Sequence, residues 1–367
     1  MVDLNASSIP ALLPLLRLEF GLNYAALAAI VMVSNLTSSV IQPLFGALTD
    51  RRYFPWLLAV APVLASVGAA ALGFASSYSM LLLFVALAGM GVSAYHPEAS
   101  RGAYTAAGDQ RVTGMSIFSV GGNIGYAFGP LVVALGAALI GGVHGTLLFL
   151  PLGLIAGMAL WRRLGRQRVD FRQHGRPAGE GAPLWGVMLL VFVVFLRSAA
   201  QVGVMSFLPL YLANTGAAAG SAGIVLFFFL LAGAVGTMVG GPISDRYGRK
   251  LILVVSFMLA APLLYVLPHA HGLLLMVALL LLGFVVVATF STTVVLAQEF
   301  LPKSVGMAAG LTLGFAIGAG GFVVLALGQY ADLHGVRAAL DLLWWLPVIG
   351  VLGSWVLPIR PRLAAVA

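Results

Sequence analysis

The sequence contains no cysteine and very few charged residues. Only 8% of its 367 residues are Asp, Glu, Lys or Arg, whereas 61% are hydrophobic. Without cysteine the chain forms no disulfide bond and performs no thiol chemistry. Soluble domains carry about 25% charged residues. This composition therefore excludes a soluble globular protein and indicates an integral membrane protein.

Several functional signatures are also lacking. The N-terminus has no basic start of the kind that precedes a cleaved leader, so we expect no signal peptide. Basic residues are not interleaved with aromatic ones, so we expect no nucleic-acid partner despite the net charge of +8. No metal-ligand cluster, nucleotide-binding loop or nucleophile-base pair is present. We therefore expect no metal, no cofactor and no enzymatic activity.

Twelve apolar segments have about the length that a membrane-spanning helix needs. They cover residues 4–20, 23–48, 54–74, 79–97, 111–139, 143–163, 184–213, 219–243, 250–268, 272–298, 304–330 and 335–358. The first segment is the weakest, because only 13 residues separate Asp3 from Arg17, and Pro10 and Pro14 interrupt them. We therefore expect a shortened first helix, with Met1 inside the membrane rather than before it.

A basic stretch divides the chain into two halves. Residues 164–183 form a polar linker between six-segment halves at 1–163 and 184–367, and the stretch from Trp161 to Pro183 holds six arginines. Positively charged loops stay on the cytoplasmic side of a membrane. With this linker inside, 16 of the 19 basic residues are cytoplasmic. We expect a multi-pass, monomeric protein of the inner (plasma) membrane with both termini in the cytoplasm.

The two halves repeat each other in sequence. Gly46-Ala-Leu-Thr-Asp50-Arg51-Arg52 follows the second segment, and Gly241-Pro-Ile-Ser-Asp245-Arg246-Tyr-Gly248-Arg249-Lys250 follows the eighth. A second match aligns residues 114–136 with residues 306–328 without gaps. Parallel repeats of six helices, related by an axis along the membrane normal, occur in one large class of transporters.

These motifs resemble those of the major facilitator superfamily. The G-x-x-x-D-R loop is similar to its loop motif, and Gly125-x-x-x-Gly129-Pro130 is similar to a motif of its drug:proton antiporters. Four stretches resemble, more narrowly, the fosmidomycin resistance protein family. They are Leu12-Leu13-Pro14-Leu15-Leu16 through Glu19-Phe20, Tyr95-His96-Pro97-Glu98-Ala99-Ser100-Arg101, Ser116-Ile117-Phe118-x-Val120-Gly121-Gly122-Asn123, and Ala297-Gln298-Glu299-Phe300-Leu301-Pro302. Members of that family have more residues before the aspartate that matches Asp3.

The resemblance implies an all-α major facilitator fold of twelve transmembrane helices in two pseudo-symmetric halves. It also implies efflux of a drug or small anionic compound such as fosmidomycin, driven by the proton gradient. An importer or uncoupled facilitator of the same fold is the first alternative. A non-transporting membrane receptor is the second, and the short loops argue against it because they leave no binding domain.

Arg197 is the strongest candidate for substrate binding. It lies about 20 Å along its helix from Leu184, which places it near the middle of the membrane. A cation at that depth costs several kcal/mol unless it faces a cavity or a partner. We interpret it as a counter-ion for an anionic substrate or for a proton-carrying carboxylate, with a buried structural ion pair as the alternative. Gln201 lies one turn further on the same face.

Asp3 is the predicted carboxylate partner of Arg197. It lies about 21 Å from Arg17 along the first helix. A carboxylate at that depth can bind a proton on one side of the membrane and release it on the other. The alternative is an ordinary acid at a helix N-terminus, which the helix dipole favours.

His96 and Glu98 flank Pro97, which we expect to end the fourth helix. Histidine titrates near neutral pH, so both side chains could relay protons. The alternative, which we prefer at this position near the interface, is a cytoplasmic network with Arg101 or Arg111 that holds helix ends together.

The remaining candidates form three groups. Polar side chains at helical spacing line a substrate path or bond neighbouring helices together: Asn35, Ser38, Ser39, Gln42, Ser116, Ser119, Asn123 and Tyr126. We prefer the substrate path for Asn123 and Tyr126. Charged residues of the loop motifs and helix ends act as conformational latches: Asp50, Arg51, Arg101, Asp245, Arg246 and Arg249. Small residues allow close helix packing: Gly121, Gly125, Gly129, Pro130, Gly306, Gly310, Gly314 and Gly318.

Overall fold

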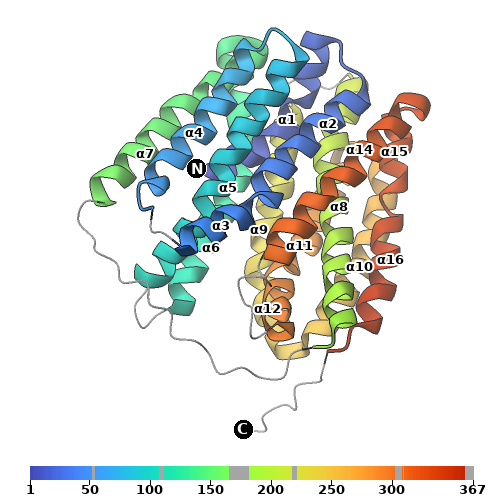
Figure 1. Ribbon diagram of the computed structural model, residues 1–367. Helices are drawn as coiled ribbons and strands as arrows, with labels where there is room; N and C mark the ends of the chain where they lie inside the picture. Colours follow the sequence, from blue (N-terminus) through green and yellow to red (C-terminus); the bar gives the residue numbers. More distant parts are fainter. Residues whose placement is uncertain are drawn as a thin grey trace.

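The computed structural model describes residues 1–51, 54–106, 111–164, 182–216, 221–301, 308 and 310–359. Within these ranges every regular element is a helix, and no strand occurs among them (Figure 1). The helices run roughly along one direction. They form two groups side by side, the blue-to-green first half and the green-to-red second half.

The first half has its helices at the positions that the apolar segments predict. They are α1 (Val2–Phe20), α2 (Tyr24–Asn35), η1 (Leu36–Val40), α3 (Gln42–Arg51), α4 (Leu57–Ala71), η2 (Leu72–Phe74), α5 (Tyr78–Ala106), α6 (Arg111–Gly136), η3 (Ala137–Gly141), η4 (Gly142–Leu148) and α7 (Phe149–Leu164). The π-helical turn η1 connects α2 to α3, so the second predicted segment is one continuous path.

The second half repeats this arrangement. It contains α8 (Leu184–Asn214), α9 (Ser221–Tyr247), α10 (Arg249–Val266), η5 (Leu267–His269), α11 (Gly272–Ala288), α12 (Phe290–Phe300), η6 (Gly310–Phe315), α14 (Ala316–His334), α15 (Val336–Leu342) and α16 (Trp345–Val356). Nine stretches of the described residues are long and apolar enough to cross a membrane. One of them, Ile117–Arg163, covers two predicted segments, and α1 and α14 lie outside the nine. The predicted all-α membrane fold is confirmed.

The expected breaks at proline residues are wrong. Pro10 and Pro14 lie inside the continuous helix α1, and Pro97 lies inside α5, which continues to Ala106. A proline removes one backbone hydrogen bond, but packed neighbours and nearby hydroxyl groups make this tolerable in membrane helices. Twelve of the 19 residues of α1 are buried, so surrounding helices cover it on most sides.

Close backbone contacts join the two halves. A Cβ on Gly328 of α14 would come 2.8 Å from the carbonyl oxygen of Tyr24 on α2. A Cβ on Gly223 of α9 would come 2.5 Å from that of Pro130 on α6. Small residues at such positions let membrane helices approach closely. The pairs α2–α14 and α6–α9 therefore form the interface, while α1 and α8 pack between them.

The predicted packing glycines do not all pack. Gly129 of α6 lies against the backbone of Leu4 on α1, and a Cβ on Gly314 would come 3.0 Å from the Ser39 carbonyl oxygen. Gly125 makes only ordinary contacts with α1. A Cβ on Gly121 would meet no atom within 4 Å, so this glycine makes no close helix contact in this structure. Gly318 packs against α2 and η1, Pro130 is buried, Gly310 begins η6, and Gly306 lies outside the described residues.

The same kind of packing holds the second half together. A Cβ on Gly236 of α9 would clash with the backbone of Phe284 on α11, and one on Gly283 would clash with the backbone of Phe229. By contrast, a Cβ on Gly241 would meet nothing within 4 Å. Gly236 and Gly283 therefore set the distance between α9 and α11.

Candidate functional site

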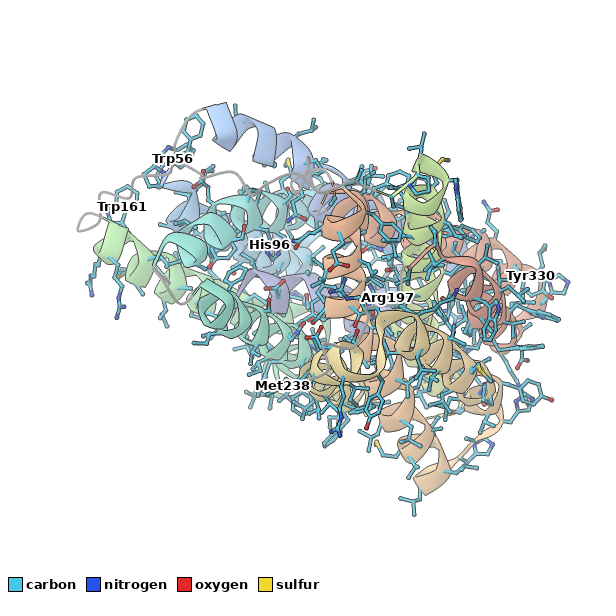
Figure 2. All side chains as sticks on the ribbon, turned by 90° about the horizontal axis from the view of Figure 1, so that it is seen from below. Trp56, His96, Trp161, Arg197, Met238 and Tyr330 are labelled. Carbon is cyan, nitrogen blue, oxygen red and sulfur yellow. The ribbon has the colours of Figure 1, made fainter. Side chains whose placement is uncertain are left out.

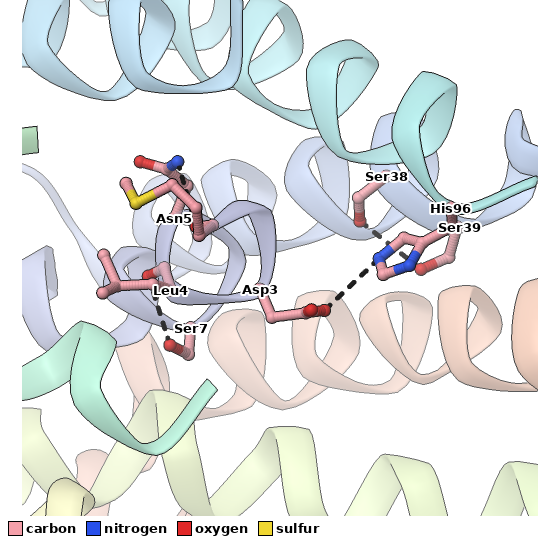
Figure 3. A network of polar contacts seen from close by, with 8 residues as sticks. Asp3, Leu4, Asn5, Ser7, Ser38, Ser39 and His96 are labelled. Atoms are coloured by element: carbon pink, nitrogen blue, oxygen red, sulfur yellow. Dashed lines mark hydrogen bonds and ion pairs between the residues drawn. The ribbon is translucent and has the colours of Figure 1, made fainter. Parts of the chain in front are cut away.

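Asp3 and His96 meet inside the first half. Asp3 Oδ1 on α1 lies 3.3 Å from His96 Nε2 on α5 (Figure 3). The two side chains are 23% and 24% exposed, respectively, so the pair is accessible although it lies inside the bundle. A carboxylate beside an imidazole can hold a proton as a neutral pair or as an ion pair. The contact therefore has the chemistry of a proton-binding site.

Glycines of α6 leave room for the Asp3 carboxylate. A Cβ on Gly122 would come 3.3 Å from Asp3 Oδ2, and one on Gly125 would come 3.9 Å from Asp3 Cβ. The predicted pairing of Asp3 with Arg197 is not what forms, because no ion pair joins them among the described residues. His96, predicted only as a relay or part of a helix-end network, is the partner instead.

Arg197 is a buried cation of the second half. Its side chain on α8 is 3% exposed, and no described residue hydrogen-bonds to its Nε or Nη1. Its Cζ lies 5.3 Å from the centre of the Phe290 ring, a cation–π contact from the start of α12. Figure 2 places Arg197 and His96 near the centre of the molecule, on the facing sides of the two halves.

This arrangement makes Arg197 a candidate anion site. An aromatic face compensates only partly for the lost hydration of a guanidinium group at this depth. The ring of Phe290 was not predicted, because no spacing in the sequence links it to Arg197. Gln201 lies one helical turn beyond Arg197 on α8, so the two side chains are neighbours on the same face. Gln201 is partly buried.

The other predicted path residues lie around this centre. Asn35 and Tyr126 line a small cavity together with Met205 of α8. Gln42, at the start of α3, and Asn123 on α6 are partly buried. Glu98 on α5 is 1% exposed, which places it inside the protein rather than at its surface.

A ring of hydrogen bonds closes one end of the bundle, which we call the Arg17 end. Arg17 Nη1 donates to the Tyr24 hydroxyl at 2.6 Å and to Asn214 Oδ1 at 2.8 Å. Asn214 Nδ2 donates to the same hydroxyl at 2.7 Å, and the guanidinium lies 4.1 Å from the Tyr24 ring centre. Because Asn214 ends α8, the ring joins the two halves.

Asp332 of α14 adds a second connection at the Arg17 end. Its carboxylate accepts hydrogen bonds from the backbone N–H groups of Tyr24 at 2.6 Å and Ala25 at 3.0 Å. The Asn23 side chain caps the same helix through Ala26 N–H at 2.9 Å. The N-terminus of α2 is thus capped from its own half and from the other. The only sequence signal was Arg17, a rare basic residue on the predicted outer side.

The structure describes the side chains of only some of the predicted latch residues. Arg249 of α10 forms an ion pair with Glu299 of α12, so it connects two helices of the second half. Arg246 lies over the Tyr247 ring, with Cζ 5.4 Å from its centre, and Asp245 is exposed. The side chains of Asp50, Arg51, Arg101, Arg111 and Ser116 lie outside the part of the chain that the structure describes.

Comparison with known proteins places this geometry in context. The sequence model of the family described as Major Facilitator Superfamily matches residues 1–325 and 190–365 of this chain. The uncharacterized MFS-type transporter YfnC of Bacillus subtilis is 36% identical over 97% of this chain and 89% of its own. The fosmidomycin resistance protein of Escherichia coli is 33% identical over 95% of this chain and 88% of its own. The solved structure of the nucleoside transporter NupG superposes with a TM-score of 0.79 at 12% identity, covering 97% of this chain and 96% of that one.

Proposed function

The chain belongs to the Major Facilitator Superfamily, a family of membrane transporters, and from this premise we propose that it exports a small anionic compound in exchange for protons. The observation that carries the proposal is the placement of two complementary groups. A proton-binding pair, Asp3 and His96, lies in the first half, and a buried cation without an anionic partner in the described residues, Arg197, lies in the second.

The closed Arg17 end supports an inward-open state, in which the binding groups are accessible only from the cytoplasm. Arg17, Tyr24, Asn214 and Asp332 bond the halves together there, and the cavity between this end and Arg197 has a volume of only about 10 Å³. Asp3 and His96 are nevertheless about a quarter exposed. We infer that their access leads to the opposite end, where α7 ends at Leu164 and α8 begins at Leu184, and that this end faces the cytoplasm.

Exchange of an anion for a proton follows from the charges of Arg197 and of the Asp3–His96 pair. An anion from the cytoplasm binds at Arg197, whose buried charge it neutralises. Opening of the Arg17 end then exposes both groups to the outside. There the anion leaves and the Asp3–His96 pair takes up a proton, which it releases after the return to the inward-open state. Each ligand needs to favour one state by only a few kcal/mol to drive this cycle.

Fosmidomycin is the first substrate to test, because one relative is a fosmidomycin resistance protein. Its anionic phosphonate suits the paired donors of a guanidinium group. Purified protein in liposomes with an internal pH-sensitive dye would be given a pH gradient and then fosmidomycin. We expect saturable proton movement that depends on fosmidomycin. Arg197→Gln should abolish this proton movement, whereas the matched control Arg337→Gln, at an exposed arginine on α15, should retain it.

The possible outcomes separate the candidate functions. Fosmidomycin flux that persists after the proton gradient is collapsed would favour an uncoupled facilitator. Uptake into cells, rather than release from them, would favour an importer. Absence of flux for every small anion tested would contradict transport itself and leave a receptor as the explanation.

A further inference from the structure

A second polar feature lies on the Arg17 side of the Asp3–His96 pair. The small cavity there is lined by α1, α2 and α6 of the first half and by α8 of the second. Val202 and Met205, two of its lining residues, lie about 8 Å and 12 Å beyond Arg197 along α8. Its volume of about 10 Å³ is roughly the space that one small polar group or water molecule occupies.

Two hydrogen-bond donors of this cavity are poorly satisfied. Asn35 Nδ2 is buried and has no partner among the described residues. The Tyr126 hydroxyl has a sulfur atom, Met205 Sδ at 3.9 Å, as its partner, and a thioether is only a weak acceptor. A buried donor without a good acceptor is unfavourable, because it has lost its hydrogen bonds to water. An oxygen acceptor in the cavity that both side chains line would offer these donors a hydrogen-bond partner.

The cavity also lies between the two halves, so movement of one half relative to the other would change its shape. Asn35 packs against the second half, because a Cβ on Gly321 of α14 would come 3.3 Å from Asn35 Nδ2. Tyr126 contacts α8 of that half through Met205. An oxygen bound here would touch both halves, and relative movement of the halves would enlarge or close its site.

We propose that Asn35 and Tyr126 form a second recognition point, which binds an uncharged acceptor oxygen of the substrate, a hydroxyl or carbonyl group. This inference rests on the proposed function, since it assigns the anionic end of the same molecule to Arg197. The substrate is then a short compound with an anionic group at one end and an acceptor oxygen toward the other.

The test measures binding, so it does not depend on transport. Alkylphosphonates with three to six methylene groups would be compared with the matching ω-hydroxyalkylphosphonates, by calorimetric titration into the purified full chain. For at least one chain length we expect the hydroxyl to tighten binding about fivefold to tenfold, the usual effect of one hydrogen bond. Asn35→Leu and Tyr126→Phe should each bring that ratio to about one. Tyr211→Phe, which removes a hydroxyl bonded to the Pro268 carbonyl, should retain it.

Three results would overturn the inference: no binding of any phosphonate to the natural protein, equal binding of each matched pair, or an unchanged ratio in both variants. Tyr126→Phe deletes a single oxygen, so it keeps the test decisive if Asn35→Leu does not fold. A preserved hydroxyl preference without any fosmidomycin flux would contradict the proposed function and leave the recognition point standing.

Discussion

The carboxylate of Asp332 caps the N-terminus of α2 by accepting a hydrogen bond from the Tyr24 N–H group at 2.6 Å. The two residues belong to different halves of the molecule. A helix cap that comes from the other half can exist only while the halves are together at the Arg17 end. The contact is therefore specific to the closed state of that end.

Removal of this cap should open the Arg17 end more often. Loss of an N-cap side chain costs about 1 kcal/mol, which corresponds to roughly a fivefold change in the ratio of two states. The chain has no cysteine, so Ser34→Cys, beside the cavity, gives a single thiol label. Asp332→Ala should accelerate labelling by an impermeant maleimide added at the Arg17 end, whereas Asp341→Ala should not. Equal labelling rates in the Asp332→Ala and Asp341→Ala variants would contradict a role of the Asp332 cap in keeping the Arg17 end closed.

Asp3→Asn and His96→Gln should uncouple transport from protons. Each change removes one member of the pair that holds the proton, but leaves Arg197 in place. We expect fosmidomycin accumulation driven by a pH gradient to disappear, while exchange of labelled for unlabelled fosmidomycin continues. His144→Gln and Asp341→Asn are the matched controls; His144 is exposed and Asp341 is partly buried. Full pH-driven accumulation in either test variant would exclude the pair as the proton site.

Arg197→Met should lower substrate affinity without lowering stability. Loss of a charge-assisted hydrogen bond to the substrate weakens binding roughly 10- to 100-fold. A cation without an anionic partner at this depth costs several kcal/mol, so a hydrophobic residue of similar length in its place should not destabilise the protein. Fosmidomycin binding and thermal unfolding in detergent would be measured on the same sample. A clear fall in the unfolding temperature would instead identify Arg197 as part of a structural contact.

Gly236→Leu should destabilise the second half. A side chain there would overlap the backbone of Phe284, and overpacking of this kind typically costs about 1–3 kcal/mol. Gly241→Leu, five residues later on the same helix, has open space and should leave the unfolding temperature unchanged. The pair of variants would be compared by thermal unfolding. A similar decrease for both would show that overlap with the Phe284 backbone does not determine the effect.

Much of the fold could be predicted from the sequence because each membrane helix satisfies its own backbone hydrogen bonds. Hydrophobicity and length alone therefore located the helices, and the repeated loop motifs indicated two halves. The prediction failed at Pro10, Pro14 and Pro97, because propensity rules describe isolated helices, whereas neighbouring helices cover the unpaired carbonyl groups here.

The candidate site was predicted less well, since its residues are brought together by packing. Arg197 could be predicted from its depth, because a lone charge in an apolar segment is costly wherever its partners lie. The partner of Asp3 could not, because His96 is 93 positions away and its side chain direction depends on how α1 packs against α5.

The sequence by itself determined the class of protein, the positions of its membrane helices and the presence of an arginine inside one of them. These properties depend on transfer of single residues or segments from water, which is local and additive. Only the tertiary structure decided that Asp3 meets His96, that Phe290 lies beside Arg197, and that Asp332 caps α2. Those contacts depend on the relative positions of helices, which the packing of the whole bundle sets.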